Sequence, residues 1–211
     1  TFDKVLCKKL LSGTEIYLAK SVVIKGSSTF SVDQICDYVG LPCFVKPNTA
    51  GSSYGVTKVY EKDKFIDAIN LAQTEDCTVI VEEYIKGVEV SCGILKTRKT
   101  NYVFPVTEIA TKNDYFDTAA KYDPSLTDEI TPARISDEET YRVQEACSFI
   151  YDKLNCKGIV RIDFIVKDRK PYFLEVNSMP GMSAESIVPK QLKTMNKELS
   201  DLLSEIIEDC F

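Results

Sequence analysis

Short runs rich in β-branched and aromatic residues alternate with amphipathic segments along most of the chain, and this alternation restricts the fold more than any other feature. Apolar residues that recur every three or four positions predict helices at 2–11, 31–39, 65–72, 136–154 and 199–206. Runs of β-forming residues predict strands at 22–24, 43–46, 56–60, 78–84, 88–95, 102–109, 159–166 and 172–176. This mixed order predicts an α+β fold.

Two of the expected helices carry further local signals. The first places Phe2, Val5, Leu6 and Leu10 on one face, the apolar side of an amphipathic helix. The long helix after residue 135 begins with Ser136 and Glu139, the spacing of a capping box.

The character of the sequence changes near residues 84–88, where β-rich runs typical of an antiparallel sheet begin. We therefore expect two α+β subdomains, at residues 1–85 and 86–211. Residues 110–135 are polar and irregular. A stretch of that length without regular structure is uncommon unless it is a functional loop, so we interpret it as a mobile loop.

The amino-acid composition excludes several classes of catalytic site, metal site and binding partner. The chain has no histidine, which excludes a Ser–His–Asp triad, a Cys–His pair and histidine-ligated zinc. Its net charge of −6 makes it a poor general binder of nucleic acid or anionic membrane. No apolar run is long enough for a membrane span and no signal peptide opens the chain. The eight cysteines form no CxxC pair, which argues against a zinc knuckle or a redox motif. Several lie inside apolar runs, which favours buried free thiols in a reducing cytoplasm over disulfides.

Two strands near the end of the chain bring polar residues to one face. Residues two apart in a strand share a face, which pairs Arg161 with Asp163 and Glu175 with Asn177. If the strands form a hairpin, two carboxylates, one amide oxygen and one guanidinium converge. Such oxygen ligands suit Mg²⁺ or Mn²⁺, and arginine complements a phosphate or an oxyanion. The alternative is a row of solvent-facing charges on a half-buried sheet.

The segment FVKPNTAGSSYGV has the composition of an anion-binding loop. Lys46 ends a strand, and the following loop contains Gly51, Ser52, Ser53 and Gly55. Glycines let backbone N–H groups approach an anion, and serines add donors. The alternative is an ordinary Gly/Ser hairpin loop.

The segment VEEYIKGVEV lies at the expected boundary, and ligand clefts favour domain interfaces. Glu82 could accept a hydrogen bond from an exocyclic amine, and Glu89 could bind sugar hydroxyls. The alternative is a solvated hairpin.

Read together, these stretches resemble the ATP-grasp carboxylate–amine ligases, and within them the D-alanine–D-alanine ligase family. The resemblance rests on FDKVLCKKLL, FVKPNTAGSSYGV, VEEYIKGVEV, AAKYDP and GIVRIDFIV…YFLEVNSMPGMSAESIVP. It implies an ATP-grasp fold, with the nucleotide cleft between two α+β subdomains.

The resemblance also implies roles in nucleotide binding. Lys4 and Lys46 match the lysines that contact ATP phosphates. Glu82 matches the acid that contacts adenine, Ile85 lies where the backbone lines the adenine slot, and Glu89 matches the ribose-binding acid.

Further residues match the family's catalytic and substrate positions. Ser52 and Ser53 lie in the loop over phosphate and substrate, and Lys121 and Tyr122 match a mobile-loop pair. Arg161 matches the arginine that stabilises the tetrahedral intermediate. The metal ligands are matched by Asp163, Glu175 and Asn177, and the contacts to a second D-alanine by Gly181, Ser186 and Ile187.

The activity that the resemblance implies is the ATP-dependent ligation of two D-alanines through an acyl phosphate, with two Mg²⁺ or Mn²⁺ ions, for peptidoglycan precursor synthesis. The family's N-terminal domain, which binds the first D-alanine, is missing from residues 1–211, so this fragment alone is expected to be inactive. The resemblance is compatible with a homodimer of the full-length protein. The alternatives are another ATP-grasp ligase and a non-catalytic nucleotide-binding module.

Overall fold

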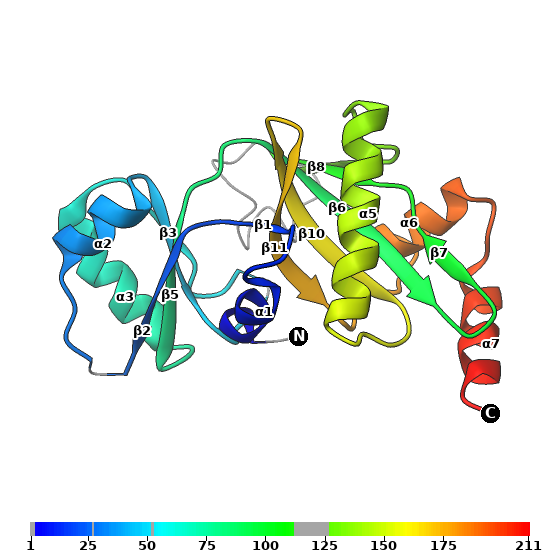
Figure 1. Cartoon of the computed structure of the whole chain (residues 1–211), viewed down its shortest axis with the longest axis horizontal. Coiled ribbons are helices and arrows are strands. Elements are labelled where there is room, and N and C mark those ends of the chain that lie inside the picture. The colour runs from blue at the N-terminus through cyan, green and yellow to red at the C-terminus, as the bar shows by residue number, and fades with distance from the viewer. Residues whose placement is uncertain (1–2, 27, 52, 112–126) are drawn as a thin grey trace.

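The computed structural model describes residues 3–26, 28–51, 53–111 and 127–211. Within these residues the chain forms two β-sheets, each covered by helices, that stand side by side (Figure 1). The α+β class expected from the sequence is confirmed.

The smaller sheet is antiparallel and has the strand order β2-β5-β3-β4. Its strands are β2 (Ser21–Lys25), β3 (Cys43–Pro47), β4 (Thr57–Val59) and β5 (Thr78–Glu83). Its helices are α2 (Val32–Val39), the 3₁₀ turn η1 (Lys62–Lys64) and α3 (Phe65–Gln73). Apolar side chains of α2 and α3 pack on one face of this sheet and form a core of their own.

The larger sheet has the order β1-β11-β10-β6-β8-β9, and β7 pairs with β6. Its strands are β1 (Tyr17–Leu18), β6 (Val88–Lys96), β7 (Asn101–Val103), β8 (Thr107–Thr111), β9 (Thr127–Ile130), β10 (Val160–Lys167) and β11 (Lys170–Asn177). Its helices are α1 (Lys4–Leu11), α5 (Asp137–Lys153), α6 (Ile187–Thr194) and α7 (Leu199–Asp209). The expected capping box of Ser136 and Glu139 is present at the start of α5.

The first helix belongs to the larger sheet, although it precedes the smaller one in sequence. Cys7 and Leu11 are buried in the core of the larger sheet, and β1 pairs in parallel with β11. The predicted apolar face is not the one that packs on the sheet, because Leu6 and Leu10 are 51% and 47% exposed. Phe2 lies outside the described residues. The chain passes from the smaller sheet to the larger one between β5 and β6. The assignment of residues 1–85 and 86–211 to separate subdomains stays a prediction.

Two other expectations are corrected. The strand expected at 102–109 is divided into β7 and β8. Pro105 lies in the break, and proline has no N–H to donate to a strand ladder. The irregular stretch expected at 110–135 contains the end of β8 and the whole of β9, which pair antiparallel. Residues 112–126 lie outside the described residues.

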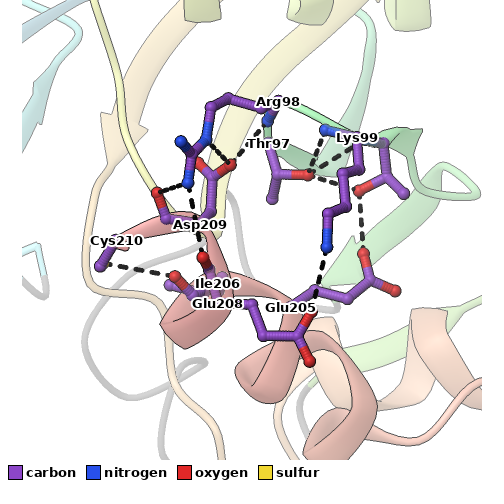
Figure 2. Close-up of polar contacts among 9 residues, drawn as sticks. Thr97, Arg98, Lys99, Glu205, Ile206, Glu208, Asp209 and Cys210 are labelled. Atoms are coloured by element: carbon purple, nitrogen blue, oxygen red, sulfur yellow. Dashed lines mark hydrogen bonds and ion pairs between the residues drawn. The ribbon is translucent and has the colours of Figure 1, made fainter.

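The last helix is tied to the hairpin between β6 and β7 by polar contacts (Figure 2). The backbone N and Nε of Arg98 donate to Asp209 Oδ1 at 2.8 and 3.1 Å. Thr100 Oγ1 donates to Glu205 Oε2 at 2.8 Å. Leu202 is fully buried on the inner side of α7, so apolar packing and the hairpin contacts together fix this helix.

All eight cysteines are free thiols, as expected, but Cys77 and Cys210 are exposed rather than buried. Among the described residues, no helix has the length and apolar character needed to cross a membrane.

Candidate nucleotide site

A pocket lies between the two sheets and is lined by residues of both. Most of the predicted site residues that the structure describes line it. The smaller sheet and its loop contribute Lys46, Ser53 and Glu82, and the connection to β6 contributes Ile85 and Glu89. Helix α1 and the larger sheet contribute Lys4, Arg161, Asp163 and Glu175.

Glu82 is the centre of a buried charge cluster. Its carboxylate accepts from Lys8 Nζ at 2.5 Å and forms an ion pair with Lys46. Lys8 also donates to the carbonyl oxygen of Ala19 at 2.9 Å. Burial alone would raise the pKa of Glu82, but the charges and hydrogen bonds of the two lysines lower it to about 2. The Glu82 side chain is therefore ionised at neutral pH.

The pairing of β3 with β5 explains how Lys46 reaches Glu82. In this antiparallel pair Glu82 lies opposite Phe44, two residues before Lys46. Lys46 and Glu82 are thus diagonal neighbours on one face, within reach of a long side chain. The adjacent Val45 points to the opposite face and is fully buried.

Lys8 was not predicted as a site residue. It comes from α1, and burial lowers its pKa while Glu82 opposes that effect. In the sequence it is one of two adjacent lysines in an amphipathic segment, which is typical of a solvated helix face. Only the packing of α1 between the two sheets places this lysine beside Glu82.

Lys4 links the loop after β3 to the larger sheet. Its Nζ donates to Ala50 O at 2.8 Å and lies 3.8 Å from Glu175 Oε2. The next residue, Val5, donates its N–H to Asn48 Oδ1 at 2.9 Å. The start of α1 therefore holds the predicted anion-binding loop next to the hairpin of β10 and β11.

The hairpin predicted from the sequence is confirmed. In its register Arg161 lies opposite Asn177 and Asp163 lies opposite Glu175. Arg161 donates to both oxygens of Asp163, from Nε to Oδ1 at 3.0 Å and from Nη2 to Oδ2 at 2.8 Å. Ser91 Oγ of β6 donates to Asp163 Oδ1 at 2.6 Å. Burial would lower the pKa of Arg161, but Asp163 and Glu175 raise it.

Four predicted residues do not line this pocket. Asn177 Oδ1 accepts from the backbone N of Met179 at 3.2 Å. Gly181 approaches Ser186 so closely that a β-carbon at Gly181 would lie 2.5 Å from Ser186 Oγ. Ile187 begins α6 and is buried. The predicted residues Ser52, Lys121 and Tyr122 lie outside the described residues.

The two sides of the pocket carry different charge clusters. Lys8 and Lys46 pair with Glu82 on one side, and the hairpin contributes Asp163, Glu175 and Arg161 on the other. Within the described ranges, no three His, Cys, Asp or Glu side chains gather as a metal site. The hairpin instead offers two carboxylates and one amide oxygen, a donor set whose chemistry suits a hard divalent cation. The arrangement fits a polyanion bound together with such a cation.

A family model described as "D-ala D-ala ligase C-terminus" matches residues 12–208. The chain belongs to this family. A D-alanine–D-alanine ligase of Bacteroides fragilis is 42% identical over 212 residues, an alignment that covers 100% of this chain and 65% of that protein. The chain thus spans about 65% of the length of this relative.

Solved structures of the family share the fold. The D-alanine–D-alanine ligase of Bacillus anthracis superposes with a TM-score of 0.85 at 35% identity, covering 99% of this chain and 66% of that one. Its complex with ATP gives a TM-score of 0.81 at 31% identity, with 99% and 65% covered. The VanG D-Ala:D-Ser ligase of Enterococcus faecalis gives 0.82 at 37% identity, with 98% and 61% covered. The expected ATP-grasp fold is confirmed.

Proposed function

We propose that the full-length protein is an ATP-dependent ligase that joins two D-alanines into D-alanyl-D-alanine for peptidoglycan precursor synthesis. The observation that carries the proposal is the pocket between the sheets, lined by nine of the residues that the family resemblance assigns to nucleotide, metal and catalysis. The family membership supports the reaction type.

The proposed nucleotide pose follows the charges of the pocket. Adenine lies near Ile85 with its exocyclic amine at Glu82, and the ribose hydroxyls lie at Glu89. The phosphates extend toward Lys4 and Lys46. Ammonium groups act here as point charges that offset phosphate charge.

The proposed metal ligands are Asp163, Glu175 and Asn177, and Mg²⁺ or Mn²⁺ fits their oxygen donors. When bound, the metal ions supply charge stabilisation for the transferring phosphoryl group. Asp163 is held by Arg161 and Ser91. Metal binding to Asp163 therefore competes with part of that contact.

The proposed reaction has two steps. The carboxylate of the first D-alanine attacks the γ-phosphorus of ATP, and the bond to ADP breaks, which forms an acyl phosphate. The deprotonated amine of the second D-alanine then attacks the acyl carbon, and phosphate leaves with the bonding electron pair. The proton that the nitrogen loses ends on the departing phosphate, which gives hydrogen phosphate and the amide. Arg161, whose guanidinium lies on the pocket wall, stabilises the oxyanion of the intermediate.

The second substrate is proposed to lie at Gly181, Ser186 and Ile187, and Ser52, Ser53, Lys121 and Tyr122 are proposed to belong to loops over the reacting groups. Exclusion of water by such loops protects an acyl phosphate from hydrolysis. The likeness to the VanG ligase supports D-alanyl-D-serine as an alternative product. A cytoplasmic location and a homodimer remain proposals for the full-length protein.

Turnover of the full-length protein tests the proposal. With ATP, Mg²⁺ and D-alanine we expect stoichiometric release of phosphate and D-alanyl-D-alanine, identified by mass spectrometry. With D-alanine, D-serine and D-lactate supplied together at neutral pH, we expect the D-alanine dipeptide to predominate. Predominance of the D-serine product would move the assignment to the alternative, and absence of any ATP-dependent product would contradict ligase activity.

A further inference from the structure

Lys8 is a buried charge that none of the roles above uses. Its side chain comes from α1, and the residue is only 8% exposed. It reaches the carbonyl oxygen of Ala19 at 2.9 Å and Glu82 Oε1 at 2.5 Å. Lys46 lines the pocket, whereas Lys8 lies behind Glu82 and is not among the residues that line it.

The charges around Glu82 do not balance. Two ammonium groups share one carboxylate. The neighbouring acid on the same strand, Glu83, accepts from the backbone N of Lys20 at 2.8 Å and is half-buried. Its charge also favours the ammonium form of Lys8, but less than Glu82 does. A buried cation in excess is costly unless an anion accompanies it. The surplus positive charge is therefore suited to an anion that enters from the pocket.

The positions of Lys8 and Lys46 indicate which of the two can bind that anion. Lys46 borders the open space, so it can turn from Glu82 to a ligand. Lys8 is enclosed and fixed by a second hydrogen bond to Ala19. If Lys46 turned away and Lys8 were absent, Glu82 would be a buried carboxylate without a cation, which is strongly unfavourable.

We propose that Lys8 is a positioning residue of the nucleotide pocket: it stays with Glu82 as its permanent cation and so frees Lys46 to bind a phosphate group. This inference rests on the proposed function, because it requires a phosphate-bearing ligand in the pocket. It adds a second residue of α1 to the site, after Lys4.

Lys8→Met tests the inference, with Lys9→Met as the matched control because Lys9 is exposed on the same helix. The probes are Mg²⁺–ATP and Mg²⁺–tripolyphosphate, titrated by calorimetry into the full-length protein. In Lys8→Met, Lys46 must remain with Glu82, so we expect both affinities to fall about tenfold or more. Lys9→Met should match the unchanged protein, and Lys8→Arg should restore most of the affinity.

A second variant separates this role from simple packing. In Lys8→Met/Glu82→Gln, Lys46 has no carboxylate to hold it, so we expect the affinity for tripolyphosphate to return to within about threefold of the unchanged protein. If Lys8→Met alone fails to fold, the double variant is compared directly with the unchanged protein, and an affinity for tripolyphosphate more than about threefold weaker would overturn the inference. Unchanged affinity in Lys8→Met, or a double variant as weak as the single one, would overturn the inference. If the unchanged protein bound neither probe, the proposed function itself would fail.

Discussion

The charge cluster around Glu82 and the cluster around Asp163 face each other across one pocket, but they balance their charges differently. Glu82 forms ion pairs with two lysines, so one of the two ammonium charges is in excess. Asp163 forms a two-point pair with Arg161 and accepts a further hydrogen bond from Ser91. Glu175, which lies opposite Asp163 in the hairpin, adds a carboxylate whose side chain is 36% exposed.

This difference indicates which ligand charge suits each side of the pocket. An anion would balance the second lysine beside Glu82. A cation would suit the hairpin side, where the carboxylate of Glu175 is accessible. Under the proposed function, a nucleoside triphosphate with its metal ion would carry both charges in one ligand. Each of the two clusters can be disturbed separately.

Glu82→Gln should give the largest effect, because it leaves Lys8 and Lys46 without their carboxylate. Removal of one partner from a buried ion pair typically costs about 3–5 kcal/mol, and we expect a loss of about 3 kcal/mol in the free energy of unfolding, measured with urea. The exposed Glu61 gives the control Glu61→Gln, expected within about 0.5 kcal/mol of the unchanged protein. A similar small change for Glu82→Gln would mean that the cluster is not tightly paired.

Lowering the pH should remove much of the stability that the ionised Glu82 contributes through its lysine pairs. The pKa of Glu82 is lowered from 4.5 to about 2 in the folded protein by Lys46 and Lys8, against the opposing effect of burial. Between these values the unfolded chain binds more protons than the folded one, so the free energy of unfolding falls as the pH falls. Urea unfolding at steps from pH 5 to pH 2.5 should show this decline. If Glu82→Gln declined with the same slope, the loss would belong to other groups.

Glu175→Gln tests the hairpin side. It removes one proposed ligand charge, so we expect Mg²⁺–ATP to bind about tenfold more weakly while the melting temperature stays within a few degrees. Glu145→Gln, on the exposed side of α5, is the control and should bind normally. Unchanged affinity in Glu175→Gln would refute the metal assignment.

Ser91→Ala should have the smallest effect of the four. It removes the buried hydrogen bond to Asp163 Oδ1, while Arg161 still holds the carboxylate. We expect a loss of about 1 kcal/mol in the free energy of unfolding. Ser204 is exposed on α7, and Ser204→Ala should change almost nothing. Equal stability of both variants would show that Ser91 does not hold Asp163.

The hairpin cluster was predictable from the sequence, whereas most of the Glu82 cluster was not. Alternation along RID and LEVN fixes which residues share a face, so only the pairing of two neighbouring strands had to be assumed. The capping box at Ser136 is likewise a local signal. Local patterns of this kind need no knowledge of distant segments.

Lys8 and β1 could not be predicted because both depend on distant partners. Lys8 is buried only because α1 packs beside Glu82, 74 positions further along the chain. Strand β1 has two residues and pairs with β11, so it shows no periodicity of its own. The same packing explains why Leu6 and Leu10 are exposed while Cys7 and Leu11 are buried.

Calorimetric titration of Lys46→Met with Mg²⁺–ATP tests most directly the central claim, that the surplus cation beside Glu82 binds phosphate. Lys64→Met, at an exposed position of η1, is the control. We predict that Lys46→Met weakens Mg²⁺–ATP binding at least about tenfold, while Lys64→Met binds and melts like the unchanged protein. Equal affinity of Lys46→Met and Lys64→Met for Mg²⁺–ATP would contradict the claim.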